Sequence, residues 1–151
     1  MKNFETINDD FIISTDKTKL QVAMIHRYLC HESYWAKNIP VAVVEKSIEG
    51  SFCFGVYHQG RQVGFARVIT DHATFAYLAD VFIVQEYRGK GLSKWLMETI
   101  MNNPALQGLR RWLLATMDAH GLYAQFGFAP LDKPERIMGM KPFDEYPPTN
   151  G

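Results

Sequence analysis

"QEYRGKGLSKWL", residues 85–96, combines glycines and cations near the middle of this sequence. It follows an apolar run ending at Val84, places two glycines among three cations between Arg88 and Lys94, and continues into a helical apolar periodicity. A strand, a glycine-rich turn and a helix are therefore predicted in succession. The first N–H groups of a helix lack partners and its dipole is positive at that end, so this junction is suited to bind a phosphate.

These residues alone leave two interpretations of the turn open. Gly89 and Gly91 allow positive φ and close approach of a phosphate, and Arg88, Lys90 and Lys94 add positive charge. Alternatively, the glycines serve only the turn geometry and the cations are solvated. Neither G-x-x-x-x-G-K-[ST] nor G-x-G-x-x-G occurs, which argues against a P-loop nucleotide hydrolase and a dinucleotide-binding fold.

Composition narrows the class of protein. The 151 residues fit a single domain, 1–151, and the 16 Lys and Arg balance 16 Asp and Glu, which argues against a nucleic-acid or membrane-surface binder. No apolar run approaches the roughly 18 residues of a membrane span, and the acidic start is unlike a signal peptide. Cys30 and Cys53 are expected to be free thiols, and the histidines show no metal-ligand spacing. A cytoplasmic protein without a metal site is predicted.

Apolar periodicity predicts an α/β domain: a mixed, mostly antiparallel sheet flanked by helices. Residues 144–151 are expected to form a loose tail. Helices are expected at 15–29 (capped by Thr15 or Asp16), at 38–51, from Leu92 to the "NNP" at 102–104, and at 119–126. Strands are expected as a short stretch near 11–14 and then at 51–57, 62–70, 75–84 and 110–116. A turn is expected at Gln59-Gly60, and a final antiparallel pair of strands at 127–131 and 136–143.

"YRGKGLS", residues 87–93, resembles the R-x-x-G-x-G/A signature of the GNAT family of N-acetyltransferases. Arg88 and Gly91 match, whereas Ser93 stands where the family usually has Gly or Ala. The order of elements over residues 10–143 also resembles this family. The resemblance implies a GNAT-like fold with acetyl-coenzyme A as co-substrate. It further implies a pyrophosphate site at Arg88, Gly89, Lys90, Gly91, Leu92 and Ser93, and pairing of the pantetheine arm with the backbone of Ile83 and Val84.

"LLATMDAHGLYAQFGF", residues 113–128, resembles the family's second signature segment, and Tyr123 falls where the family has a tyrosine near the coenzyme sulfur. The resemblance implies that Tyr123 is the general acid; without it, a half-buried helical aromatic would be expected. Asp118 is expected to cap the helix. His120 is expected to be a surface residue, with a proton relay as the alternative.

Asp80 is the candidate general base, because it is the carboxylate of the central strand nearest the expected reaction centre. Burial there would make it a stronger base; its alternative role is a structural one, bonded to neighbouring backbone. By the resemblance, acetyl passes by direct attack to an amine of a small molecule or peptide. Tyr28, Tyr34, Trp35, Phe75 and Tyr77 could wall the acceptor pocket. A non-catalytic acetyl-coenzyme A sensor and a longer-chain acyltransferase are the alternatives, and a homodimer is left open.

Overall fold

A six-stranded sheet forms the centre of the computed structural model, which describes residues 2–148. The strands lie in chain order: β1 Glu5–Asn8, β2 Phe11–Ser14, β3 Phe52–His58, β4 Arg61–Thr70, β5 Phe75–Ile83 and β6 Arg111–Leu114. Neighbouring strands are antiparallel except β5 and β6, which are parallel. This confirms the predicted mixed, mostly antiparallel sheet and the interior position of the long apolar strand β5.

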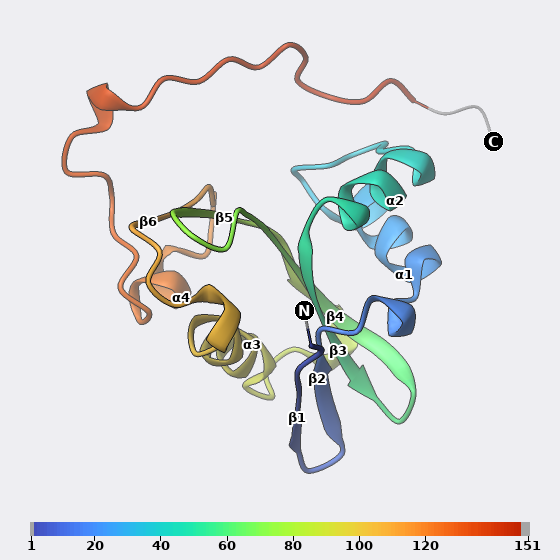
Figure 1. The fold of residues 1–151 in the computed structure, drawn as a ribbon. Helices are drawn as coiled ribbons and strands as arrows, with labels where there is room; N and C mark the ends of the chain where they lie inside the picture. The colour runs from blue at the N-terminus through green and yellow to red at the C-terminus, as the bar shows by residue number, and fades with distance from the viewer. Residues whose placement is uncertain (1, 149–151) are drawn as a thin grey trace.

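Helices cover both faces of this sheet (Figure 1), with α1 and α2 on one side and α3 and α4 on the other. Their bounds are α1 Val22–Arg27, α2 Val41–Glu49, α3 Leu92–Met101 and α4 His120–Ala124. A π-helical turn, Tyr28–Glu32, continues α1, and 3₁₀ turns occupy Lys17–Lys19, Gln85–Tyr87, Pro104–Leu106 and Pro134–Arg136.

The buried side chains of α3 and the central strands form the core. Leu92, Leu96 and Ile100 of α3 are buried, as the periodicity predicts, and Phe54 and Phe65 of β3 and β4 are fully buried. Each such side chain contributes about 1.5–3 kcal/mol when it leaves water. The core thereby fixes α3, and with it the turn at its N-terminus, against the sheet.

The β3–β4 hairpin forms where Gln59-Gly60 predicts a turn. Both residues have positive φ (49° and 82°), and His58 pairs with Arg61, so the loop has the two residues expected of a hairpin turn that matches strand twist. Strand β1 was not predicted. It is a four-residue strand at the edge of the sheet, too short and polar to show a clear alternation.

The predicted first helix is broken into three short pieces. Asp16 caps a 3₁₀ turn by accepting from the Thr18 N–H, and α1 begins only at Val22. Gln21 is held between them, because its N–H donates to Gln62 Oε1 while the Gln62 N–H donates to Gln21 Oε1. These tertiary bonds to a fully buried side chain outweigh the helical periodicity of the sequence.

The predicted final strand pair, 127–131 with 136–143, is wrong. Within residues 2–148 the sheet ends at β6, and the chain after Phe128 runs as an exposed extended segment with one 3₁₀ turn. Glu145 and Tyr146 of the expected loose tail lie against the loop before α2, where Asn38 Nδ2 donates to Glu145 Oε1 and to the Tyr146 carbonyl, each at 3.2 Å. Residues 149–151 lie outside the described part of the chain.

Candidate active site

A cavity of about 710 Å³ opens where β5 and β6 separate. The two strands pair only from Phe75–Arg111 to Leu78–Leu114; β6 then ends while β5 continues to Ile83. Residues 78–81 of β5 line one side of the cavity, and residues 114–119, which lead from β6 towards α4, line the other. An extended ligand in this gap would lie beside the part of the β5 backbone that no longer pairs with β6.

Asp80 lies at an irregularity of β5 in the wall of this cavity. The register of β4 with β5 shifts after Phe65, and Asp80 adopts φ 53°, a left-handed conformation that is uncommon for a residue other than glycine. Such a bulge re-aims backbone and side chain, and strained residues of this kind cluster at functional sites. The direction of β5 backbone groups at the gap is therefore set by Asp80.

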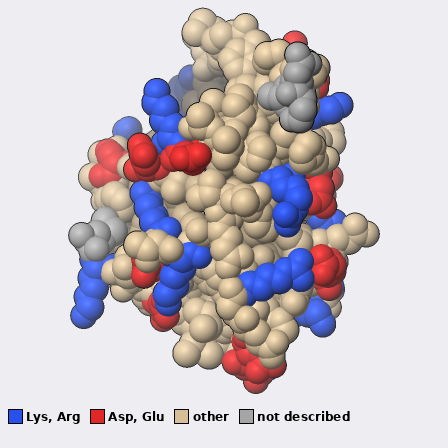
Figure 2. Space-filling view, turned by 90° about the vertical axis from the view of Figure 1, so that its right-hand side faces the viewer, with Lys and Arg blue, Asp and Glu red and all other residues tan. Residues whose placement is uncertain are grey.

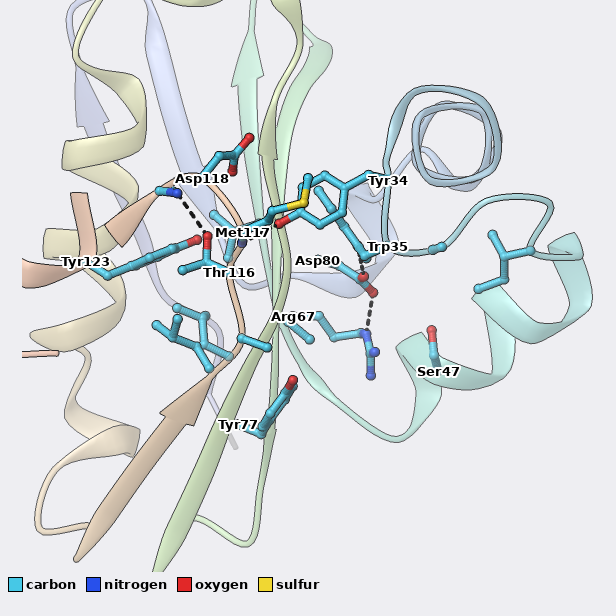
Figure 3. A pocket seen from close by; sticks show the side chains of 18 of the residues that line it. Tyr34, Trp35, Ser47, Arg67, Tyr77, Asp80, Thr116, Met117, Asp118 and Tyr123 are labelled. Atoms are coloured by element: carbon cyan, nitrogen blue, oxygen red, sulfur yellow. Dashed lines mark hydrogen bonds and ion pairs between the residues drawn. The ribbon is translucent and has the colours of Figure 1, made fainter. Parts of the chain in front are cut away.

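Both carboxylate oxygens of Asp80 accept hydrogen bonds (Figure 3). Trp35 Nε1 donates to Oδ1 at 2.8 Å, and Arg67 Nε donates to Oδ2 at 2.9 Å. Arg67 also donates to Ser51 Oγ through Nη1, at 3.0 Å. The side chains of Arg67 and Asp80 are largely buried, at 16% and 10% exposed. Asp80 is thus where it was predicted, but as a member of an ion pair.

Aromatic side chains form much of the cavity wall. Tyr34 and Trp35 come from the loop before α2 and pack edge to face, with ring centroids 5.0 Å apart. The Tyr34 hydroxyl accepts from the Met117 N–H at 2.9 Å and so connects that loop to the segment after β6. Tyr77 completes the three expected wall residues found here. Tyr28 and Phe75, which were also expected, are not among the residues that line this cavity.

Tyr123 projects into the cavity from α4 (Figure 3). Its ring packs edge to face on Phe128, with centroids 6.1 Å apart. Burial raises the pKa of Tyr123 to about 12, and the nearby Tyr34 and Asp118 act in the same direction. The phenol is therefore protonated at neutral pH, and no hydrogen bond engages its hydroxyl within residues 2–148. It can donate a proton or hydrogen bond to a group in the gap.

The prediction that Asp118 caps α4 is wrong. The helix begins after Ala119, and no side-chain hydrogen bond caps it within the described residues; the Ala119 N–H donates to Thr116 Oγ1 at 3.0 Å in the turn before the helix. Asp118 is exposed and lines the cavity instead. His120 is exposed at the first position of α4 and does not line the cavity.

The glycine-rich turn has the conformation of an anion cradle. Gly89 and Gly91 both have φ 80°, and no atom lies within 4 Å of where a Cβ of either would be. Gly91 precedes α3 without a side-chain cap, and the first bond of the helix runs from Trp95 N–H to the Gly91 carbonyl. The earlier amides of α3 therefore lack helical partners and face an open approach. This geometry suits the binding of an anion.

Arg88 is exposed, yet its guanidinium group bonds back onto the protein. Its Nε donates to the Ile83 carbonyl at 3.0 Å and Nη2 donates to the Tyr28 hydroxyl at 2.8 Å. Tyr28 in turn stacks on Phe82, with centroids 3.9 Å apart. Arg88 thus ties the turn to the end of β5.

The backbone groups of Ile83 and Val84 differ in whether they already have hydrogen-bond partners within the protein. The Val84 N–H donates to the Val63 carbonyl and the Val84 carbonyl accepts from the Tyr87 N–H, so both groups have partners. Ile83 is opposite Gly64, between two bonded pairs, so its N–H points away from β4 and towards the gap. Lys90 is exposed beside the turn, Ser93 is half-buried, and Leu92 packs its side chain in the core.

The sequence analysis did not single out several residues of the cavity, among them three with polar side chains. Arg67 is a single cation in an apolar strand, and its opposition to Asp80 is visible only once strand register is known. Ser47 faces the cavity from α2, and Tyr146 reaches it from the far end of the chain. For Arg67 the sequence held one signal, a single arginine among the apolar residues of "GFARV".

Charges on the molecular surface are mixed. On the face that carries α1 and α2, Lys and Arg are interspersed with Asp and Glu (Figure 2). None of the helices in residues 2–148 has the length and apolarity needed to cross a membrane. Within the same residues, no three His, Cys, Asp or Glu side chains are grouped as a metal site would require.

Comparison with known proteins identifies the family. The model of the acetyltransferase (GNAT) domain matches residues 49–130. A candidate acetyltransferase of Gibberella zeae is 32% identical over 164 residues, covering 94% of this chain and 85% of that protein. The crystal structure of a candidate GNAT-family acetyltransferase from Xanthomonas campestris pv. campestris is 53% identical, with a TM-score of 0.85, and the match covers 87% of this chain and 92% of that one.

A more distant structure adds a ligand to the comparison. A candidate acetyltransferase from Clostridium acetobutylicum, solved with acetyl-coenzyme A, has the same fold at 12% identity, with a TM-score of 0.61 and coverage of 93% and 95% of the two chains. The six-stranded sheet, its helices and the gap between β5 and β6 define an acyltransferase fold. The chain belongs to the GNAT family of acetyltransferases and is an acyltransferase.

Proposed function

We propose that this protein transfers the acetyl group of acetyl-coenzyme A to an amine of a small molecule or peptide by direct attack. One observation carries the proposal: β5 and β6 separate over a cavity that holds Tyr123 on one side and Asp80 on the other. Acetyl-coenzyme A supplies an activated thioester; the protein supplies binding, orientation and proton transfer.

The turn before α3 would bind the pyrophosphate. Unpaired amides from Gly89 to Ser93 provide donors at the positive end of the helix, and Lys90 adds charge from the surface. Arg88 acts indirectly by fixing the turn on β5. The Ile83 N–H, directed into the gap, would pair with the pantetheine arm, whereas the Val84 backbone is already bonded within the protein.

Tyr123 and Asp80 would move the two protons. The Tyr123 hydroxyl donates to the departing sulfur, for which its raised pKa of about 12 keeps it protonated. Asp80 accepts the amine's proton through a water, using a lone pair that Trp35 and Arg67 leave free. The aromatic wall suits an amine with an apolar or cationic body. Neither step requires a covalent bond to a side chain.

An amine library assayed with acetyl-coenzyme A, read as release of free thiol, tests the proposal. We expect acetylation of at least one primary amine, with the acetylated amine confirmed by mass spectrometry. Binding of acetyl-coenzyme A without turnover of any amine would favour a non-catalytic coenzyme-binding role. Acyl transfer only from coenzyme A thioesters with longer acyl chains would change the proposed donor but leave the proposed site unchanged.

A further inference from the structure

Arg67 has a hydrogen-bond donor that the protein itself does not use. Its Nε donates to Asp80 and its Nη1 to Ser51, at 2.9 and 3.0 Å, whereas Nη2 donates to no acceptor within residues 2–148. The fully enclosed side-chain atoms without a partner in these residues are Tyr57 Oη and Asn103 Nδ2, so Nη2 keeps an accessible surface. Because Arg67 lines the cavity, a ligand there can supply the missing acceptor.

The guanidinium group lies beside the carboxylate of the candidate base (Figure 3). Arg67 comes from β4 and Asp80 from β5, and both side chains are largely buried. The Ser51 hydroxyl that accepts from Nη1 is also buried and donates to the Ser47 carbonyl, so it holds the guanidinium group in place. The cavity thus presents a fixed cation next to the carboxylate that the proposed mechanism uses as base.

Neighbouring opposite charges are complementary to a zwitterion. An α-amino acid carries its amine and its carboxylate on one carbon, so its carboxylate can bind Arg67 Nη2 while its amine lies near Asp80. Hydrogen bonds between a guanidinium group and a carboxylate are charge-assisted and stronger than neutral ones. An amine without a carboxylate would leave Nη2 unpaired in a largely buried position, which costs free energy.

The cavity wall next to this ion pair suits an apolar or aromatic side chain. Tyr77 is opposite Ile69 in the β4–β5 ladder, and Ile69 is two residues from Arg67, so Tyr77 and Arg67 share one face of the sheet. Val43 of α2 and Trp35 of the preceding loop line the same cavity. These three side chains carry no charge and offer two aromatic rings.

A diamine is the alternative that the second acidic residue of the cavity suggests. Asp118 lines the cavity but is exposed, so a second ammonium group would gain little from pairing with its solvated carboxylate. The unused donor of Arg67 is largely buried and gains more from a partner of opposite charge. The cavity therefore favours an acceptor that carries a carboxylate.

We propose that the acceptor is a free α-amino acid with an apolar or aromatic side chain, whose carboxylate binds Arg67 Nη2. This inference rests on the acetyl transfer proposed above. The neutral amine attacks the thioester carbonyl, a C–N bond forms and the C–S bond breaks. Water carries the amine's proton to Asp80, the Tyr123 hydroxyl protonates the sulfur, and solvent restores both side chains. The products are an N-acetylamino acid and free coenzyme A.

Pairs of substrates that differ only in the carboxylate test this inference. Phenylalanine is compared with 2-phenylethylamine, and leucine with 3-methylbutylamine, in thiol-release assays with acetyl-coenzyme A. We expect kcat/KM to be higher for the amino acid of each pair by about tenfold or more, mainly through a lower KM. Equal values, or faster transfer to the amines or to 1,4-diaminobutane, would overturn the inference while leaving acetyl transfer established.

Arg67→Gln removes the guanidinium group and should reduce the preference for the amino acid by about tenfold or more. The two substrates are compared within each variant, so disturbance of Asp80 and the different basicity of the two amines cancel. Arg61→Gln is the matched control, because Arg61 lies on the same strand, pairs with Glu86 at 3.1 Å and does not line the cavity. It should keep the natural preference. An undiminished preference in Arg67→Gln would overturn the role of Nη2.

Calorimetry separates failure of this inference from failure of the proposed function. If none of these amines is acetylated, acetyl transfer to them fails, yet phenylalanine should still bind more tightly than 2-phenylethylamine in the presence of coenzyme A. The absence of that difference would overturn the assignment of an amino acid to the cavity.

Discussion

Arg67 and Asp80 face each other across β4 and β5 at the point where their register shifts, with Nε and Oδ2 2.9 Å apart. The pair forms part of the cavity wall, and its Asp80 member has the left-handed φ of 53°. Arg67 fixes one oxygen of the carboxylate beside the aromatic wall, and Trp35 fixes the second.

Asp80→Asn separates proton transfer from support of the bulge. If Asp80 accepts the proton, kcat/KM should fall about a hundredfold or more, and the acid limb of the pH–rate profile should disappear. Arg67→Lys keeps the positive charge and serves as the control for disturbance of the pair. Equal loss of activity at every pH in Asp80→Asn would instead assign Asp80 a purely positioning role.

Gly91→Asp should abolish or strongly weaken acetyl-coenzyme A binding. The side chain would enter open space before α3, and a carboxylate there repels the pyrophosphate. Gly91→Asn is the matched control, because both side chains have the same shape and tolerate φ 80° better than other residues. Calorimetric titration should show a loss of at least tenfold, about 1.4 kcal/mol, between the two variants. Equal affinities would place the pyrophosphate elsewhere.

Cys53 should make the fold sensitive to alkali. Burial raises the pKa of its thiol from 9.0 to about 11. Below pH 9 the folded and unfolded chains both keep the proton; between pH 9 and 11 only the folded chain does, so stability is lost as the pH rises. At pH 10 the cost is on the order of 1 kcal/mol.

Urea unfolding of the natural protein and of Cys53→Ala at pH 8 and pH 10 measures this cost. The variant should start less stable, because a buried side chain is shortened, yet the stability that it loses between the two pH values should be smaller by about 1 kcal/mol. Cys30→Ala, which also removes a buried thiol, is the control. Identical pH dependence of the natural protein and Cys53→Ala would refute the assignment.

Local signals in the sequence predict much of this fold. The run into Val84, the glycines at 89 and 91 and the periodicity of α3 are all local, so the strand, turn and helix could be expected from residues 85–96 and their neighbours. The hairpin at Gln59-Gly60 is local in the same sense. The predicted cap of α4 failed because the helix begins one residue later than expected, after Ala119, and no side chain caps it within residues 2–148.

Contacts between residues far apart in the sequence determine the features of the fold and site that local sequence patterns do not predict. The Gln21–Gln62 pair interrupts the first helix through two side chains 41 residues apart. Arg67 lies in the site because the register of β4 with β5 places it opposite Asp80. Tyr146 lies there because the extended segment after Phe128 returns to the cavity. Residues 136–143 have the composition of a strand, but a strand forms only where an edge receives it.

Tyr123→Phe should lower kcat by at least tenfold and leave acetyl-coenzyme A affinity nearly unchanged. The variant keeps the ring that packs on Phe128 and removes only the hydroxyl. A cysteine-like thiol has a pKa of about 8.5, so a phenol with a pKa of about 12 is protonated throughout the working pH range and can share its proton with the departing sulfur. Positioned acids contribute about a hundred- to ten-thousandfold in rate. Steady-state rates with an amine from the library, and calorimetry with acetyl-coenzyme A, measure the two quantities. Tyr34→Phe, which removes a neighbouring cavity hydroxyl bonded to Met117, controls for the loss of any phenol. Turnover at the natural rate in Tyr123→Phe would reduce Tyr123 to a packing residue and leave water or His120 to protonate the sulfur.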